Sequence, residues 1–247
     1  MTTAPRFRLG FDIGGTFTDF VLVDERTGRV LLNKVLTTPR EPAAAVIDGL
    51  RTLLDRDGLT PDDVVIAIHA TTLITNALIE RTGARTALVT TEGFRDVLEL
   101  GTEVRYDIYD LFLEKPDPLV PRRWRFEVRE RLDHEGRVLT PLNKPGLLKI
   151  ASEIKRDGVE AVGVAFLHSF RNPDHEREAR AVLADALPDA SVCISSEVAP
   201  EIREFDRTST TVANAYVQPL ARDYIGDLER RLASDIGYRR RTFYMLS

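Results

Sequence analysis

Near the start of the chain lies a short polar segment with the composition of a phosphate-binding turn. Residues 12–19 read Asp-Ile-Gly-Gly-Thr-Phe-Thr-Asp and stand between two apolar runs. The adjacent glycines Gly14 and Gly15 let backbone N–H groups approach an anion closely. The hydroxyls of Thr16 and Thr18 can donate hydrogen bonds to phosphate oxygens. The segment predicts a phosphate site; the alternative is an ordinary tight hairpin whose polar groups only satisfy the turn.

The two carboxylates of this segment need a cation if phosphate is to bind beside them. A bare carboxylate would repel phosphate, whereas one that ligates Mg²⁺, directly or through water, helps to hold it. We therefore expect Asp12 to be a metal ligand, and Asp19 to support the water shell of the metal or to pin the hairpin. The string from Gly10 to Thr16 comes close to a P-loop. Thr16 stands where that motif has lysine, and a strand rather than a helix follows, so a Walker site is excluded.

A second polar segment, His-Ala-Thr-Thr-Leu-Ile-Thr-Asn, begins at His69, where another apolar run ends. His69 can act as a general acid or base near pH 7, or donate to a substrate carbonyl. Thr71, Thr72 and Asn76 stand at the start of the helix expected to follow, whose free N–H groups can receive an anion. Because α/β folds place ligands at the ends of crossover strands, we take these four as candidate catalytic residues. The alternative is that His69 is structural and that Thr71 or Thr72 only caps the helix.

The order of the expected elements predicts the fold class. Strands are expected at 7–13, 18–24, 30–36, 64–69 and 86–89, with helices at 43–54 and from about 71 to 81. A three-stranded antiparallel meander followed by parallel crossovers is typical of the ribonuclease-H-like α/β topology of actin-like ATPases. A dinucleotide-binding domain would alternate strands and helices from the outset. We assign residues 1–101 to this nucleotide-phosphate-binding domain.

The rest of the chain divides into three further segments. Residues 102–145 are expected to be an insertion with a hairpin at 124–139, in which Trp124, Phe126 and Val128 alternate with a solvated, arginine-rich face. Residues 146–200 predict a second, smaller α/β unit. Residues 201–247 predict a long helix over 208–236 and a strand that begins a further domain.

Composition excludes several classes of function. The chain has 247 residues, a formal net charge of −5 and one cysteine, Cys193. It therefore has no internal disulfide, and no Cys and His spacing resembles a zinc site. The acidic charge balance argues against binding to nucleic acid or to an anionic membrane. Without an apolar leader or a spanning stretch, a cytoplasmic protein is expected.

Several long strings resemble the amino-terminal region of the hydantoinase/oxoprolinase family, which includes hydantoinase A, 5-oxoprolinase and the acetone carboxylase β subunit. They are DIGGTFTD, HATTLITNALIERTGARTALVTTEGFRDVLELG, DIYDLFLEKPDPLVPR, RFEVRERLDHEGRVLTPL and REFDRTSTTVANAYVQP. The resemblance covers essentially the whole chain. It implies an actin-like fold, ATP and Mg²⁺ as cofactors, and a hairpin at Asp12–Asp19 that wraps the β- and γ-phosphates.

The resemblance also implies an activity and partners. ATP would activate a cyclic amide of the hydantoin or 5-oxoproline type by phosphorylation before ring opening, and a hydantoinase B-like subunit and an oligomeric assembly are expected. Three alternatives stay open: a ketone carboxylase subunit, a non-catalytic nucleotide-binding or assembly module, and a small-molecule kinase. Family members continue further and no second Gly-Gly-Thr cluster occurs here. We therefore expect this chain alone to hold half of the nucleotide site and to turn over little.

The insertion contains four further polar candidates. Arg105, Tyr106, Asp107 and Tyr109 either face a substrate or form a solvated loop.

Overall fold

The computed structural model describes residues 6–38, 41–102, 109–110, 112 and 114–246. The chain forms two compact units: unit 1 takes Met1–Glu80 and Leu220–Ser247, and unit 2 takes Arg81–Pro219. This division differs from the segments expected from the sequence. The reason is that residues from both ends of the chain build one sheet, a long-range pairing that local patterns do not reveal.

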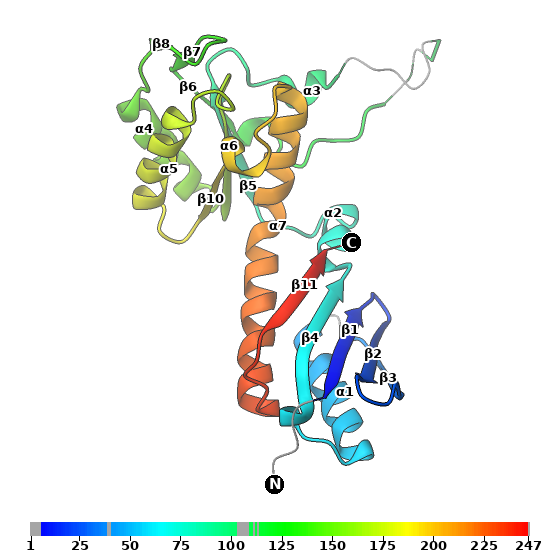
Figure 1. Ribbon diagram of the computed structural model, residues 1–247. Helices are drawn as coiled ribbons and strands as arrows, with labels where there is room; N and C mark the ends of the chain where they lie inside the picture. Colours follow the sequence, from blue (N-terminus) through cyan, green and yellow to red (C-terminus); the bar gives the residue numbers. More distant parts are fainter. Residues whose placement is uncertain (1–5, 39–40, 103–108, 111, 113, 247) are drawn as a thin grey trace. The chain divides into compact units, whose positions relative to one another are not determined.

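Unit 1 is built on a mixed sheet of five strands in the order β11-β4-β1-β2-β3 (Figure 1). The predicted meander is confirmed: β1 (Phe7–Ile13), β2 (Phe17–Asp24) and β3 (Val30–Leu36) pair antiparallel in sequence order. The crossover strand β4 (Val64–Thr71) lies parallel to β1, and β11 (Thr242–Leu246) lies parallel to β4. Strand β1 is therefore paired on both edges.

The strand expected at 86–89 forms, but it belongs to a different sheet. This strand, β5 (Thr86–Thr91), lies in the parallel sheet of unit 2, whose order is β10-β9-β5-β6. The other strands there are β6 (Arg125–Val128), β9 (Ala161–Ala165) and β10 (Ser191–Ile194). The place beside β4 in unit 1 is taken by β11, so the 86–89 strand, which we assigned to the domain of residues 1–101, does not join the sheet of that domain.

Strand β6 also corrects the expected hairpin at 124–139. Only β7 (Arg131–Leu132) and β8 (Val138–Thr140) form an antiparallel pair, whereas β6 pairs with β5 in parallel. Arg125, expected on a solvated face, is only 1% exposed. Its guanidinium pairs with Glu99 at 3.1 Å, and its Nε donates to the Val120 carbonyl at 2.9 Å. Parallel sheets are usually covered on both faces, and Arg125 accordingly does not point to water, whereas Glu127, two residues further along β6, is exposed.

The helices surround these sheets. They are α1 (Pro42–Asp57), α2 (Leu73–Ile79), α3 (Val97–Leu100), α4 (Lys144–Arg156), α5 (Asp174–Ala186), α6 (Ser195–Val198) and α7 (Glu204–Arg231), with short turns at Pro61–Asp63, Arg122–Trp124 and Leu232–Ile236. Helix α1 begins at Pro42 and is capped at its C-terminus by Gly58, whose left-handed backbone (φ 65°) suits glycine. Helix α7 contains Pro219 and contributes residues to both units.

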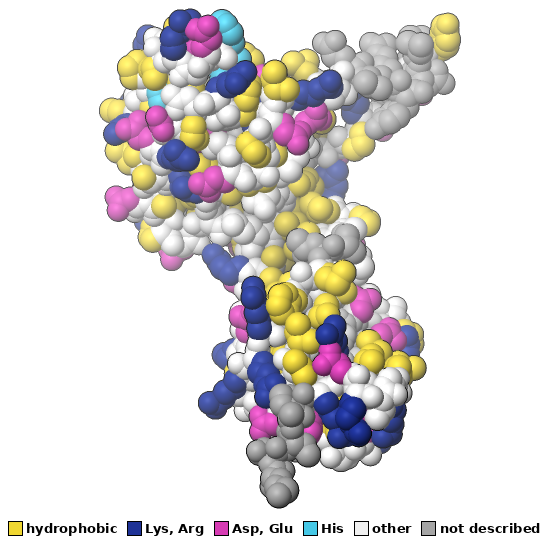
Figure 2. All heavy atoms as spheres, in the orientation of Figure 1, with side chains coloured by type: hydrophobic (Ala, Val, Ile, Leu, Met, Phe, Trp, Pro, Cys, Tyr) yellow, Lys and Arg dark blue, Asp and Glu magenta, His cyan; other side chains and the backbone are white. Residues whose placement is uncertain are grey.

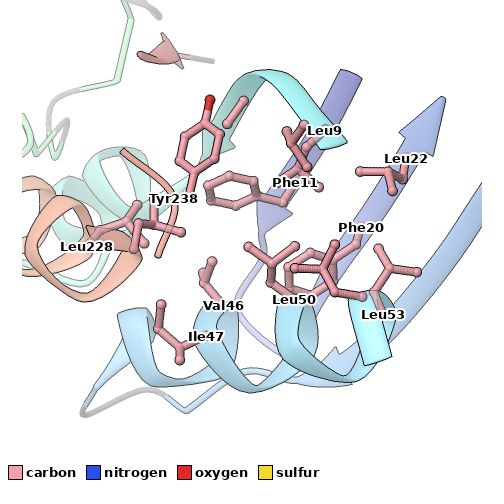
Figure 3. Close-up of a cluster of buried hydrophobic side chains, with 14 of the residues drawn as sticks. Leu9, Phe11, Phe20, Leu22, Val46, Ile47, Leu50, Leu53, Leu228 and Tyr238 are labelled. Carbon is pink, nitrogen blue, oxygen red and sulfur yellow. The ribbon is translucent and has the colours of Figure 1, made fainter. Parts of the chain in front are cut away.

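Helix α1 covers one face of the sheet of unit 1. Its apolar side chains point at the inward side chains of β1 and β2 (Figure 3). Gly49 of α1 makes the closest approach, because a Cβ atom added there would lie 2.4 Å from Cε2 of Phe20 and 3.2 Å from Cγ2 of Val35. The opposite face of this sheet carries exposed hydrophobic side chains, which appear as yellow spheres over its strands in Figure 2.

Two helical glycines provide a matched test of this packing. Gly49→Ala should destabilise the chain by about 1–3 kcal/mol, because the methyl group overpacks against Phe20 and outweighs the better helix propensity of alanine. Gly226→Ala, in α7, meets nothing within 4 Å and should stabilise by about 0.5–1 kcal/mol. Urea unfolding of both variants measures these differences. Stabilisation by Gly49→Ala would contradict the packing described here.

Candidate functional site

The turn between β1 and β2 presents its tip to solvent. The N–H of Gly14 donates to the carbonyl of Phe17 at 3.0 Å and closes the hairpin. A Cβ atom on Gly14 would lie 3.2 Å from that carbonyl oxygen, so a side chain there would force the turn to shift slightly. Gly15 and Thr16 are exposed at the tip. The turn therefore offers backbone and a hydroxyl to an anion, as a phosphate site requires.

Thr18 does not share this exposure. It is fully buried, and its hydroxyl lies 3.0 Å from the hydroxyl of Thr37, which donates to the carbonyl of Gly14 at 2.9 Å. The N–H of Thr37 donates to the carbonyl of Thr16 at 2.9 Å. Thr18 thus ties the hairpin to the segment after β3, and its expected contact with phosphate is not possible in this arrangement. The alternation along β2 places Thr18 inward with Phe20, a signal that the sequence already carried.

Asp12 and Asp19 face each other across β1 and β2, on the sheet face away from α1. They are direct cross-strand partners, and Lys34 of β3 is the partner of Asp19 on its other side. The ammonium of Lys34 lies 2.5 Å from the carboxylate of Asp19. Among the described residues, no cationic side chain forms an ion pair with Asp12. Lys34 is a site residue that the sequence reasoning missed, although the period of two along β3 places it on this face.

These side chains border a shallow depression of about 640 Å³, whose floor includes Gly10, Val21 and Ala70. Two carboxylates directly opposite each other repel, and Lys34 neutralises only Asp19. Hard oxygen donors suit Mg²⁺, but the described residues contain no group of three or more Asp, Glu, His or Cys that could hold a metal alone. The donor set therefore fits a Mg²⁺ ion that keeps most of its ligands from water and phosphate.

The start of α2 lies beside the hairpin. The hydroxyl of Thr72 is 3.5 Å from the carbonyl of Ile13, and the side-chain amide of Asn76 is 3.4 Å from that hydroxyl. A Cβ atom on Gly15 would lie 4.0 Å from the same amide nitrogen, so Asn76 faces the turn. Thr71 is buried, and its hydroxyl accepts from the N–H of Leu73 at 3.0 Å. Thr72 and Asn76 therefore join the hairpin site, whereas Thr71 holds the start of the helix.

His69 lies inside the core of unit 1 rather than at its surface. It is 0% exposed, and its ring stacks on Phe11 with centroids 4.5 Å apart. Nδ1 is 3.2 Å from the carbonyl of Phe11, and Nε2 is 2.7 Å from the hydroxyl of Tyr224. Tyr244 meets the ring edge-on, with centroids 5.8 Å apart. Because both ring nitrogens are hydrogen-bonded and no atom of the ring is exposed, His69 cannot contact a ligand in this arrangement. Its role here is structural, as in the alternative interpretation of the sequence.

The partners of His69 select one tautomer. A carbonyl can only accept, so Nδ1 carries the proton toward Phe11. In the neutral ring Nε2 is then an acceptor, and the hydroxyl of Tyr224 donates to it. Burial lowers the pKa of His69 to about 4, against the hydrogen bond to Phe11, which raises it. Burial also raises the pKa of Tyr224, so its hydroxyl keeps its proton. His69 is neutral at pH 7.

A separate polar cluster lies in unit 2 at the carboxyl ends of its parallel strands. The carboxylate of Glu176 accepts from the N–H of Phe166 at 2.9 Å and from the hydroxyl of Ser195 at 2.6 Å. Glu130 lies 2.7 Å from Nδ1 of His175. All of these side chains are buried, and their contacts join the ends of β9 and β10 to α5. The cluster fastens the strand ends of unit 2 and was not foreseen from sequence.

Two further expectations concern the insertion and the membrane. Arg105, Tyr106 and Asp107 lie outside the described residues, and Tyr109 is 90% exposed. Within the described part of the chain, every helix is too short or too polar to cross a bilayer.

The buried His69 makes stability depend on pH. Its folded pKa of about 4 lies below the ordinary 6.5, so the unfolded chain binds the proton more tightly. This contribution is complete above pH 6.5 and is lost as pH falls toward 4, reaching a loss of about 2 kcal/mol near pH 5. Urea unfolding at pH 7 and pH 5 measures it. The same measurement on His69→Gln, in which residue 69 does not titrate, gives the pH dependence that comes from all other groups, and subtracting it leaves the contribution of His69. If the free energy of unfolding depends equally on pH in both proteins, the assignment is contradicted.

Several known proteins are similar in sequence to this chain. A family model described as the hydantoinase/oxoprolinase N-terminal region matches residues 8–187. The chain is 45% identical to an uncharacterized protein of Methanocaldococcus jannaschii over 222 residues (89% of this chain, 32% of the relative). It is 39% identical to the caprolactamase subunit alpha of Pseudomonas jessenii over 248 residues (98% and 35%).

Solved structures are similar to the fold of this chain. The crystal structure of the ATP-dependent caprolactamase from Pseudomonas jessenii superposes with a TM-score of 0.87 at 39% identity, covering 96% of this chain and 35% of that one. Nucleotide-free acetone carboxylase superposes with a TM-score of 0.82 at 25% identity, covering 91% and 34%. These matches support the predicted actin-like fold class, and the chain spans about a third of the length of these relatives. The chain belongs to the hydantoinase/oxoprolinase family, whose N-terminal region it matches.

Proposed function

We propose that this chain is the amino-terminal part of an ATP-dependent enzyme that activates a cyclic amide by phosphorylation before ring opening. The observation that carries the proposal is the β1–β2 hairpin, with its exposed Gly15 and Thr16 and, beside it, the carboxylate of Asp12, which forms no ion pair with the described residues. Similarity to caprolactamase supports the class of substrate, because caprolactam is a cyclic amide.

Each hairpin residue would have its own role in binding the phosphates. The backbone at Gly14 and Gly15 and the hydroxyl of Thr16 would donate to phosphate oxygens. Asp12 would hold Mg²⁺, which when bound neutralises phosphate charge and orients the transferring group. Lys34 keeps the Asp19 carboxylate compensated, so that the face is not doubly negative before nucleotide arrives. Thr72 and Asn76 lie beside this turn and would line its other side.

The chemistry explains why ATP is needed. An amide carbonyl is stabilised by resonance, and its oxygen is a poor leaving group. Transfer of the γ-phosphoryl group to that oxygen, with ADP as the product, converts it to a phosphate ester. Attack of water on that carbon gives a tetrahedral intermediate, and cleavage of its C–N bond, with a proton delivered to the nitrogen, opens the ring and leaves an acyl phosphate. A second water hydrolyses the acyl phosphate to a carboxylate and inorganic phosphate. Positioned donors and a metal ion stabilise the charge on the transferring phosphoryl group.

The proposal includes a second subunit and an assembly. Caprolactamase is named by its subunits. We therefore expect a hydantoinase B-like partner, an oligomer and a cytoplasmic location for the whole enzyme. A ketone carboxylase subunit is the second candidate, supported by the similarity to acetone carboxylase. Consumption of bicarbonate with ATP would separate the two. A non-catalytic nucleotide-binding module would bind Mg²⁺-ATP without turnover.

Removal of the Asp12 carboxylate tests the phosphate site. Asp12→Ala should weaken Mg²⁺-ATP binding by about tenfold or more, because a ligand or orienter of the metal is lost. Asp48→Ala, a matched change on an exposed aspartate of α1, should leave binding unchanged. Calorimetric titration of the complete gene product and of this chain provides both measurements. Equal binding by Asp12→Ala and wild type contradicts the assignment of Asp12, and absence of binding by the wild-type gene product contradicts the ATP proposal.

A further inference from the structure

The side chain of His69 holds a specific point of β1, the peptide group that leads into Asp12. Its Nδ1–H donates to the Phe11 carbonyl. The atoms from the α-carbon of Phe11 to the α-carbon of Asp12 lie in one peptide plane, so a bond that orients this carbonyl also orients the start of residue 12. The side chain of Asp12 then leaves on the opposite face of the sheet from His69.

The His69 ring is itself held from three sides. Phe11 stacks on one face, and the hydroxyl of Tyr224, on α7, donates to Nε2. Tyr244 of β11 meets the ring edge, and its own hydroxyl donates to Glu229 of α7 at 3.1 Å. The ring therefore has one position and one tautomer, both determined by neighbours from β1, β11 and α7.

Packing alone does not require a histidine here. The ring contacts the rings of Phe11, Tyr224 and Tyr244, and a phenylalanine would fill the space without two buried polar atoms that each need a partner. What a phenylalanine lacks is the N–H toward Phe11. The feature that distinguishes the residue is therefore the hydrogen bond to the peptide that precedes Asp12.

We propose that His69 is a positioning residue for the phosphate site: its Nδ1–H fixes the Phe11–Asp12 peptide, and Tyr224 holds the ring in the tautomer that makes this bond. The inference rests on the proposed function of the hairpin. His69 touches neither nucleotide nor metal, and it acts through the backbone of β1 on the direction of the Asp12 carboxylate.

Two amide substitutions separate the two ring nitrogens. Asn places an N–H donor where Nδ1 lies, whereas Gln places its amide near Nε2 and removes the side-chain donor to the Phe11 carbonyl. Both remove the ring and should lower the melting temperature to a similar extent. His69→Asn should keep the wild-type Kd for Mg²⁺-ATP, and His69→Gln should raise it by about tenfold or more, as loss of an outer-shell partner does.

A second pair of variants controls for loss of a buried hydroxyl. Tyr224→Phe and Tyr238→Phe each remove one tyrosine hydroxyl from the same core, but that of Tyr238 donates to the carbonyl of Arg241 at 3.0 Å and does not contact His69. Similar losses in melting temperature are expected. Only Tyr224→Phe should weaken Mg²⁺-ATP binding and alter the ¹⁵N signals of the His69 ring, which in the wild type should show protonated Nδ1 and bare Nε2.

The outcomes distinguish this inference from the proposed function. Equal Kd values for the Asn and Gln variants at equal melting temperature would overturn the positioning role while leaving the ATP proposal intact. If the wild-type gene product binds no Mg²⁺-ATP, the proposed function fails, and the amide signal of Asp12 still decides whether His69 orients the Phe11–Asp12 peptide. Hydrogen exchange at that amide should accelerate in His69→Gln and not in His69→Asn; no difference between them would overturn it.

Discussion

The pairing of β1 on both of its edges is the constraint on which the candidate site depends. Antiparallel pairing with β2 sets Asp12 opposite Asp19, and parallel pairing with β4 sets Phe11 beside His69 and Asp12 beside Ala70. A slip of one residue on either edge would send the carboxylate into the core and an apolar side chain to the surface. The burial of Phe11 against α1 opposes such a slip.

The two faces of this sheet differ in whether their polar side chains are buried or accessible to solvent. The inward face is closed by α1 and the end of α7, and its polar members Thr18 and His69 are satisfied by other protein groups. The outward face keeps its charged members, Asp12, Asp19 and Lys34, in reach of solvent. Because polar groups of both kinds come from the same two short motifs, residue type alone did not separate structural from ligand-facing roles. The direction of the side chain did.

Sequence patterns predicted the local features of the fold and left the long-range ones open. The meander, α1 with its Pro42 start and Gly58 end, and β4 follow from turns, caps and apolar periods, which act over a few residues. The pairing of β11 with β4, and the departure of β5 to another sheet, join residues far apart in the chain, and no local signal specifies them. Within the site, alternation along β2 could have placed Thr18 inward, but nothing in the sequence pointed to Tyr224 as the partner of His69.

The buried polar groups of the two units differ in what they constrain. In unit 2, Glu176 accepts from backbone at Phe166 and Ser196 and from the hydroxyl of Ser195, so one carboxylate gathers several strand and helix ends. In unit 1, His69 makes a single bond to the main chain, at the residue before the exposed carboxylate of Asp12. Glu176 supports a whole edge of a sheet, and its loss would affect folding first. His69 constrains one peptide group, so its loss should mainly change the position of the next residue, Asp12.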